Sequence, residues 1–221
     1  YVGKVNVKGH TKTTKRTFWE EILYGFHLIF HPFDGFWDLK HEKRGSIRGA
    51  VFYIFITIIA FTYKSVGSSY MMNPSGNYMS IFSVIVSVAA PLLLWCVSNW
   101  CLTTLFDGEG SFKDIFIATS YALVPLALIL IPTTIASYIV IESEIQVINF
   151  LCGIAYAWTG FLVFFGSMVT HDYSFGKNVL ICIFTLVGVV FIVFLALLFV
   201  SLINQIISFV LNIVLELPYR V

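Results

Sequence analysis

The side chains with the chemistry for catalysis or metal binding gather at two places in the sequence. His27, His31 and Asp34 lie in one short stretch, and His171 is followed directly by Asp172. Imidazole and carboxylate groups of this kind can coordinate a metal ion or act as a general acid and base. Histidines four residues apart are also common on helices at a membrane surface. We therefore expect hydrogen bonding at helix ends, with no metal, no cofactor and no catalytic residue at either place.

The apolar runs of the chain hold no Asp, Glu, Lys, Arg or His away from their ends. An ionisable group at the membrane centre usually marks a proton relay, an ion path or an active site. The motifs HExxH, GxSxG and the P-loop are also absent from the sequence. These observations argue against ion-coupled transport and intramembrane hydrolysis, and they predict a protein that is not an enzyme. The cysteines fall inside the apolar runs without zinc spacing, and we expect them to act as small hydrophobic residues: Cys96, Cys101, Cys152 and Cys182.

The overall composition indicates which kind of fold must position these residues. Of the 221 residues, 58% are hydrophobic and 11% are charged, and the mean hydropathy is +0.89. A soluble domain carries about 25% charged residues, so this much apolar surface must be covered by lipid. The formal net charge of +1 argues against a nucleic-acid partner. The sequence therefore predicts an all-α fold, a polytopic bundle of transmembrane helices in contact with membrane lipid.

Five apolar runs are each long enough to cross about 30 Å of hydrocarbon at about 1.5 Å per helical residue. They cover residues 49–66, 78–106, 115–141, 145–169 and 178–201. The fifth run stays apolar to about residue 217 without a turn residue, so we expect one helix that crosses and then extends. Pro125 and Pro132 each remove a helical N–H, which predicts a kink in the third span. Three parts of the chain result: a flexible cytoplasmic arm or linker (1–17), an amphipathic interfacial segment (18–47) and a five-span membrane domain (48–217).

The distribution of basic residues predicts the orientation of the spans. Nine of the thirteen Lys and Arg residues lie at or before Arg48, and the later loops alternate between basic and non-basic. Loops rich in Lys and Arg remain on the cytoplasmic side of a membrane. We therefore expect a cytoplasmic N-terminus, a C-terminus outside, and a multi-pass location in a cell membrane.

The segment before the first span combines aromatic and basic side chains. Apolar residues from Phe18 to Phe30 recur at helical spacing, and Pro32 ends this predicted helix. Such a mixture beside a span favours either the headgroup region of the inner leaflet or a surface that binds another protein. The candidate partner-binding residues in this segment are Trp19, Phe33, Phe36, Trp37, Lys40 and Arg44.

Polar residues also lie within the apolar runs. In the fifth run Ser201, Asn204 or Gln205, Ser208, Asn212 and Glu216 recur every three or four residues, which places them on one helical face. We expect this face to lie along the outer interface or against another protein, with Ser208, Asn212 and Glu216 as candidate contacts. Asn99, Asn204 and Gln205 are expected to hydrogen-bond between helices, and substrate binding is the alternative.

The stretch from Asn99 to Pro125, NWCLTTLFDGEGSFKDIFIATSYALVP, resembles the core of the Yip (Ypt-interacting protein) membrane domain. In that family a short inner loop G-x-G-S-F, followed by Lys, leads into a helix with Tyr-x-Leu-x-Pro. The matching residues are Gly108, Gly110, Ser111, Phe112, Lys113, Tyr121 and Pro125. The segment YGFHLIFHPFDGFWDLKHEKRGS is similar to the bacterial branch, particularly that of Gram-positive organisms. We expect Ser111 to cap the third helix, and this loop to pack against the segment from Phe33 to Trp37.

The resemblance implies a protein without enzymatic activity in a bacterial plasma membrane. Eukaryotic members bind prenylated Rab GTPases, which bacteria lack, and some bacterial relatives are associated with ABC transporters. The resemblance therefore implies an accessory, assembly or scaffold partner of another membrane complex, with an ABC transporter as a candidate. One alternative is a component of a lipid or small-molecule transporter or channel, built on Asn99, Asn204, Gln205 and the two prolines. The other is a membrane-embedded enzyme that uses the inner-face His and Asp groups.

Overall fold

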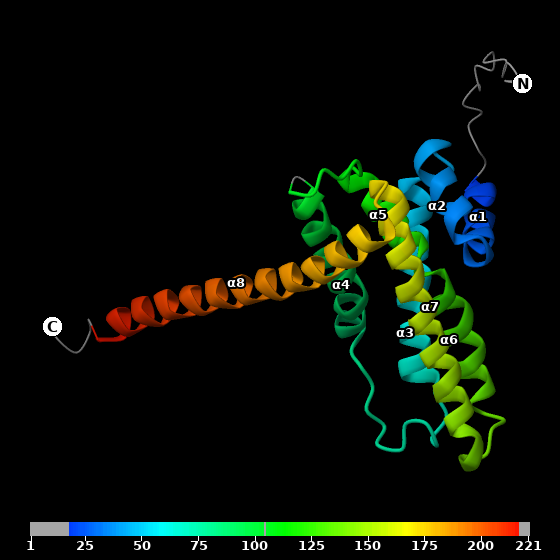
Figure 1. Cartoon of the computed structure of the whole chain (residues 1–221). Helices are drawn as coiled ribbons and strands as arrows, with labels where there is room; N and C mark the ends of the chain where they lie inside the picture. The colour runs from blue at the N-terminus through cyan, green and yellow to red at the C-terminus, as the bar shows by residue number, and fades with distance from the viewer. Residues whose placement is uncertain (1–17, 104, 217–221) are drawn as a thin grey trace, which may run out of the picture.

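The computed structural model describes residues 18–103 and 105–216 (Figure 1), so the predicted arm, residues 1–17, lies outside the described part. Within the described residues every regular element is a helix, and no strand is present. Five helices or helix pairs are long and apolar enough to cross a membrane. The predictions of an all-α fold and of five spans are therefore confirmed.

Two short helices precede the first span. Helix α1 (Phe18–Phe30) carries Glu20 and Glu21 in its first turn, where the helix dipole favours acidic groups. Helix α2 (Pro32–His41) begins at Pro32, whose missing N–H is not needed at the first helical position. Pro32 thus ends α1, as predicted, and it also begins a second helix that we did not predict.

The membrane-capable helices follow the predicted runs, with ends shifted by a few residues. They are α3 (Ile47–Gly67), α4 (Ile81–Thr103), α5 (Phe112–Tyr121), α6 (Val124–Ala136), α7 (Ile145–His171) and α8 (Phe175–Glu216). Helices α5 and α6 together make the third span, and a short 3₁₀ helix, η1 (Glu142–Glu144), leads into α7.

The third span is broken rather than kinked at the first of its prolines. Helix α5 ends at Tyr121, and α6 starts at Val124 with Pro125 in its first turn. A proline there costs no internal hydrogen bond of the new helix, which explains why the break falls before it. Pro132, by contrast, lies inside α6 and does not end the helix.

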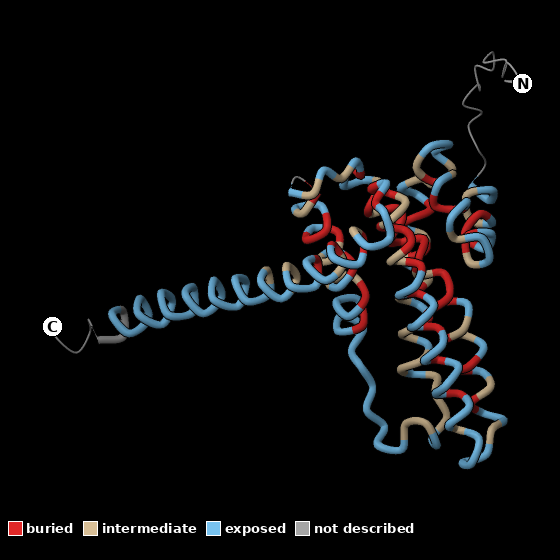
Figure 2. Tube along the Cα trace, viewed as in Figure 1, coloured by how far each residue is buried: buried red, intermediate tan, exposed pale blue. Residues whose placement is uncertain are grey.

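The core lies where α2, α5 and α7 meet, at the end of the bundle that also carries α1 and the α4–α5 loop (Figures 1 and 2). We call this the loop end. Its main cluster includes the fully buried side chains of Leu28, Tyr121 and Leu162. The rings of Tyr53 and Tyr121 pack edge to face there, with centroids 4.9 Å apart. Burial decreases away from the loop end, where α3, α6 and α7 run side by side (Figure 2).

Helix α8 differs from the other spans in its length and in its packing. Its 42 residues correspond to about 63 Å, roughly twice the hydrocarbon thickness of a bilayer. It contacts α7 and α4 near its start and then runs away from the bundle at a steep angle (Figure 1). Every residue from Val193 to Ile213 is exposed (Figure 2). The predicted extension beyond Ser201 is present, as one continuous helix.

Candidate functional site

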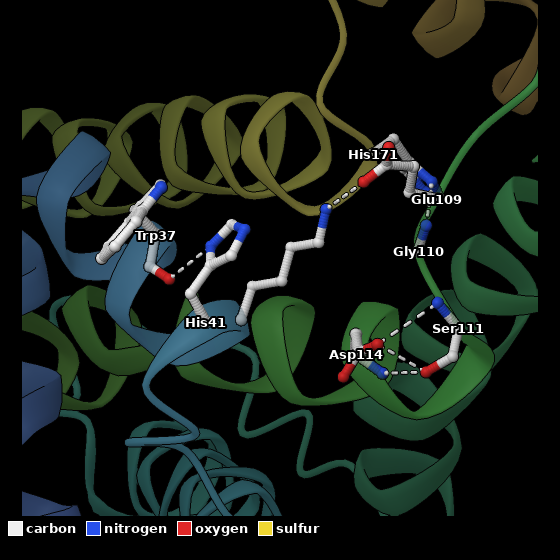
Figure 3. Close-up of polar contacts among 8 residues, drawn as sticks. Trp37, His41, Glu109, Gly110, Ser111, Asp114 and His171 are labelled. Atoms are coloured by element: carbon white, nitrogen blue, oxygen red, sulfur yellow. Dashed lines mark hydrogen bonds and ion pairs between the residues drawn. The ribbon is translucent and has the colours of Figure 1, made fainter. Parts of the chain in front are cut away.

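The centre of the loop end is a buried hydrogen-bond network around His171, the last residue of α7. Nδ1 of His171 accepts a hydrogen bond from the backbone N–H of Gly110, at 3.3 Å (Figure 3). Nε2 must therefore carry the proton, and it donates to Oδ1 of Asn99 at 2.6 Å. The side chain of His171 is 1% exposed. Both ring nitrogens are thus occupied within the fold, and the ring is neutral.

Asn99 extends this network to two further helices. Its Nδ2 donates to Oγ of Ser167 in α7 and to Oγ1 of Thr185 in α8, both at 3.3 Å. The neighbouring Ser98 donates to the backbone carbonyl of Thr185 at 2.8 Å. Asn99 therefore joins α4, α7 and α8 near the loop end by hydrogen bonds between helices.

The glycines of the α4–α5 loop allow the backbone to lie directly on the ring of His171. A Cβ atom at Gly110 would stand 2.7 Å from Cε1 of that ring, and one at Gly108 would stand 2.8 Å from its Nδ1. Real side chains do not approach so closely. The two glycines of the G-x-G-S-F motif thus have a packing role.

Ser111 begins α5 with a capping box, as expected. Its Oγ accepts from the N–H of Asp114 at 3.3 Å, and the carboxylate of Asp114 accepts from the N–H of Ser111 at 3.3 Å (Figure 3). This reciprocal pair satisfies two backbone donors that no helical carbonyl can reach. The remaining motif residues do not cluster: Tyr121 is in the core, while Phe112 and Lys113 are exposed.

Helix α2 packs against the same loop end. Nζ of Lys40 forms an ion pair with Oε2 of Glu109 at 3.1 Å, which ties α2 to the α4–α5 loop (Figure 3). Phe36 is 1% exposed and lies against α7, where a Cβ atom at Gly166 would stand only 3.0 Å from its ring. The expected contact between loop and pre-helix segment therefore forms through Lys40, a few residues beyond the predicted stretch.

The burial of Phe36 corrects one candidate. A side chain packed between α2 and α7 is not available to a partner while the fold is intact, so Phe36 is a core residue. The other aromatic candidates remain accessible: Trp19 is 69%, Trp37 50% and Phe33 49% exposed. Their helices thus present an aromatic surface beside the loop end.

Arg44 is held by interactions within its own segment. Its guanidinium pairs with Asp38 at 3.2 Å and with Glu42 at 2.7 Å, and it lies 5.5 Å from the centre of the Tyr24 ring. Burial, and then the nearby Asp38 carboxylate, raise the pKa of the Tyr24 phenol above its ordinary value. The phenol therefore keeps its proton, which it donates to the carbonyl of Gly35 at 3.0 Å. These contacts fix the chain between α2 and α3.

Two other histidines lie together at the start of the described chain. His27 of α1 and His31, which lies between α1 and α2, are both exposed and stack with ring centroids 4.8 Å apart. Among residues 18–103 and 105–216, no three His, Cys, Asp or Glu side chains are placed to hold a metal ion. Sequence reasoning missed that His171 pairs with Gly110 and Asn99. The only available signal was a histidine ending one span and a Gly-x-Gly loop following another.

The polar residues beyond Ser201 stand apart from this network. Asn204, Gln205, Ser208 and Asn212 are all exposed on α8, and they have no hydrogen-bond partner in the described part of the chain. Glu216 is the last residue of α8. The interhelical bonds expected for Asn204 and Gln205 are thus not made within the described residues.

These features define a class of protein: a helical membrane protein with five membrane-capable helices, closed at one end by two short helices and a glycine loop. The sequence of residues 26–198 matches the model of the Yip1 domain, and the chain belongs to the Yip1 domain family. No curated protein and no solved structure matches the chain.

Proposed function

We propose that this protein is not an enzyme and acts by binding another integral membrane protein, as an accessory, assembly or scaffold component. An ABC transporter in a bacterial plasma membrane is the partner that the family resemblance favours. The observation that carries the proposal concerns the part of α8 from Ser201 onward, which we call its outer half. Its polar side chains lie on one face, are exposed, and have no hydrogen-bond partner in the described part of the chain.

The energetics of a membrane helix support this reading of α8. A helix of about 63 Å extends well beyond about 30 Å of hydrocarbon, so topology alone does not require its outer half. The side chains on either side of Ser208 and Asn212 are large, apolar and exposed, so lipid or a protein must cover them. In such apolar surroundings serine and asparagine side chains cost free energy unless they are hydrogen-bonded. A second membrane protein that supplies donors and acceptors along the face of Ser208 and Asn212 would recover this energy.

The surface of α1 and α2 offers a second contact. Exposed Trp and Phe side chains are enriched where proteins meet, and a few of them dominate the affinity. Trp19, Phe33 and Trp37 lie beside a cluster of basic residues, which the charge distribution of the sequence assigns to the cytoplasmic side. The partner would thus be contacted on both sides of the membrane.

The geometry of the network weighs against the two alternatives. Asn99 uses both atoms of its amide group within the fold, so it offers nothing to a transported substrate. His171 is buried, and both its ring nitrogens are engaged. Asn99 is thus removed from the candidates for a transport path, and His171 from those for catalysis.

Purification in mild detergent, with quantification of the membrane proteins recovered alongside the chain, tests the proposal. Trp37→Ala and the pair Ser208→Leu with Asn212→Leu should each reduce recovery of one defined membrane complex, while insertion into the membrane stays normal. Ile206→Leu, on the apolar side of the same helix, is the control and should leave recovery unchanged. A preparation that holds no stoichiometric membrane partner in any variant would contradict the proposal.

A further inference from the structure

A cavity of about 280 Å³ lies between α3, α4, α7 and the junction of α5 and α6. Thr57 of α3, Pro91 of α4 and Tyr156 of α7 line it, together with Leu123 at the α5–α6 break. Each of these residues lies near the middle of its span. If these helices cross the bilayer together, the cavity is at the depth of the hydrocarbon core.

The walls of the cavity are mostly apolar, and Trp95 and Tyr156 are the lining residues whose polar group is not bonded within their own helix. No charged residue lines it. The hydroxyl groups of Thr57, Ser87 and Thr119 each donate to a backbone carbonyl of their own helix, at 2.7, 2.8 and 2.8 Å. A water molecule needs two to four polar partners, and protons already used within a helix do not supply them. An apolar occupant is therefore favoured over water or a polar solute.

The cavity is accessible from the side of the bundle that faces lipid. Pro91 and Ser87 on α4 are exposed at its edge, and so is Tyr156 on α7. The deeper walls are closed: Val88, Leu92 and Leu126 are between 5% and 8% exposed. Helix α4 packs on α3, α5 and α8, and at the loop end it is joined to α7 by the hydrogen bonds of Asn99.

The size of the cavity decides between two apolar occupants. One turn of an α-helix, about 10 Å across and 5.4 Å high, occupies roughly 400 Å³, so a helix of another protein does not fit. A single flexible hydrocarbon chain is much narrower and can enter from the side. Its headgroup can remain at the membrane surface, because the cavity opens sideways toward the lipid.

We propose that this cavity binds the middle segment of one acyl chain of a membrane phospholipid, inserted between α4 and α7 and held against Val88, Leu92 and Leu126. The site is independent of the proposed partner surfaces, which lie on α1, α2 and the outer half of α8. It makes a lipid part of the packed bundle at the place where the third span is broken.

The test uses the whole chain in vesicles that contain a phosphatidylcholine with a photoactivatable diazirine in the middle of one acyl chain. After irradiation, mass spectrometry locates the labelled residues. Label is expected on the closed walls, at Leu92 and Leu126, as well as on the lipid-facing residues Leu93 and Val97. Val88→Phe fills the cavity and should lower labelling of the walls about tenfold, without changing that of Leu93. Val86→Phe, the same change at an exposed position of the same helix, should have no effect.

One further variant and one further probe complete the experiment. Ser87→Phe narrows the mouth from an exposed position, so it should lower wall labelling even if Val88→Phe does not fold. A free fatty acid with the same diazirine distinguishes the source of the chain. Wall labelling by the fatty acid alone would overturn the assignment to phospholipid. Label confined to exposed residues, or equal wall labelling in the Val86, Val88 and Ser87 variants, would overturn the site.

Discussion

Nε2 of His171 and Oδ1 of Asn99 lie 2.6 Å apart, and this hydrogen bond connects the end of α7 to the buried face of α4. It links the loop contact at Gly110 to the interhelical contacts of Asn99 in one continuous network. Because the ring nitrogens and the amide are all engaged, we assign the network a structural role.

Replacement of Asn99 by leucine should destabilise the bundle. The change leaves the Nε2 proton of His171 buried without an acceptor, and an unsatisfied buried group costs about 1–3 kcal/mol. Thermal unfolding in detergent should therefore show a clearly lower midpoint for Asn99→Leu. Val97→Leu, at a lipid-facing position of α4, should leave the midpoint within error. An Asn99→Leu protein as stable as the parent would mean that the network contributes nothing to folding.

Replacement of Gly110 by alanine should lower the stability of the bundle, although it adds only one methyl group. The added Cβ would lie 2.7 Å from the ring of His171, so the loop or the ring must move. Gly160→Ala is a matched control, since nothing lies within 4 Å of a Cβ there. That change removes a helical glycine and should raise stability by about 0.5–1 kcal/mol. Unfolding midpoints that shift in the same direction in both variants would contradict the close packing of the loop.

The ion pair between Lys40 and Glu109 should contribute a small free energy to the packing of α2 against the α4–α5 loop. Glu109 is exposed, so the pair is worth about 0.2–1 kcal/mol and should weaken with salt. Lys40→Glu should speed hydrogen exchange in α2, and a second change, Glu109→Lys, should restore part of the protection. If the double variant exchanges as fast as Lys40→Glu, the two side chains do not interact across this contact.

The orientation proposed from the loop charges can be tested by cysteine labelling in a variant without the four native cysteines. Cysteines at Ser75 and Ser143 should react with an impermeant reagent in intact cells. Those at Glu109 and Ser174 should react only after permeabilisation. These four positions are exposed, so burial does not confuse the result. Reaction of the Glu109 position in intact cells would reverse the orientation.

The apolar runs predicted much of this fold, because a helix that faces lipid must be apolar over most of its length. They predicted α3, α4 and α7 to within a few residues, and Ser111 was expected as the N-cap of α5, where it forms a capping box with Asp114. The course of α8 away from the bundle could not be predicted, because the residues before Ser201 are almost all apolar and indicate no preferred packing face. The same limit applies to Phe36, which resembles its exposed neighbour Trp37 in sequence and differs from it only in the face of α2 that it occupies.

Residue pairing across the chain was the other unpredictable part. The sequence identified Asn99, His171 and the glycine loop separately, yet their contact depends on how three helices converge. His171→Ala is consequently a poor test of catalysis, because it removes a structural hydrogen bond. His31→Ala is the cleaner test: His31 is exposed on the loop end, and its loss should leave function unchanged.

The central claim, that α8 binds another membrane protein, is tested most directly by photo-crosslinking along its outer half in living cells. A photoreactive amino acid is placed in turn at Gln205, Ser208, Val210 and Asn212, and the adducts are identified by mass spectrometry. The expected result is one defined integral membrane protein attached from Gln205, Ser208 and Asn212, with little or no adduct from Val210, which lies on the opposite, apolar side of the helix. Adducts with lipid alone at all four positions, or equal and unselective protein adducts around the helix, would contradict a partner-binding face on α8.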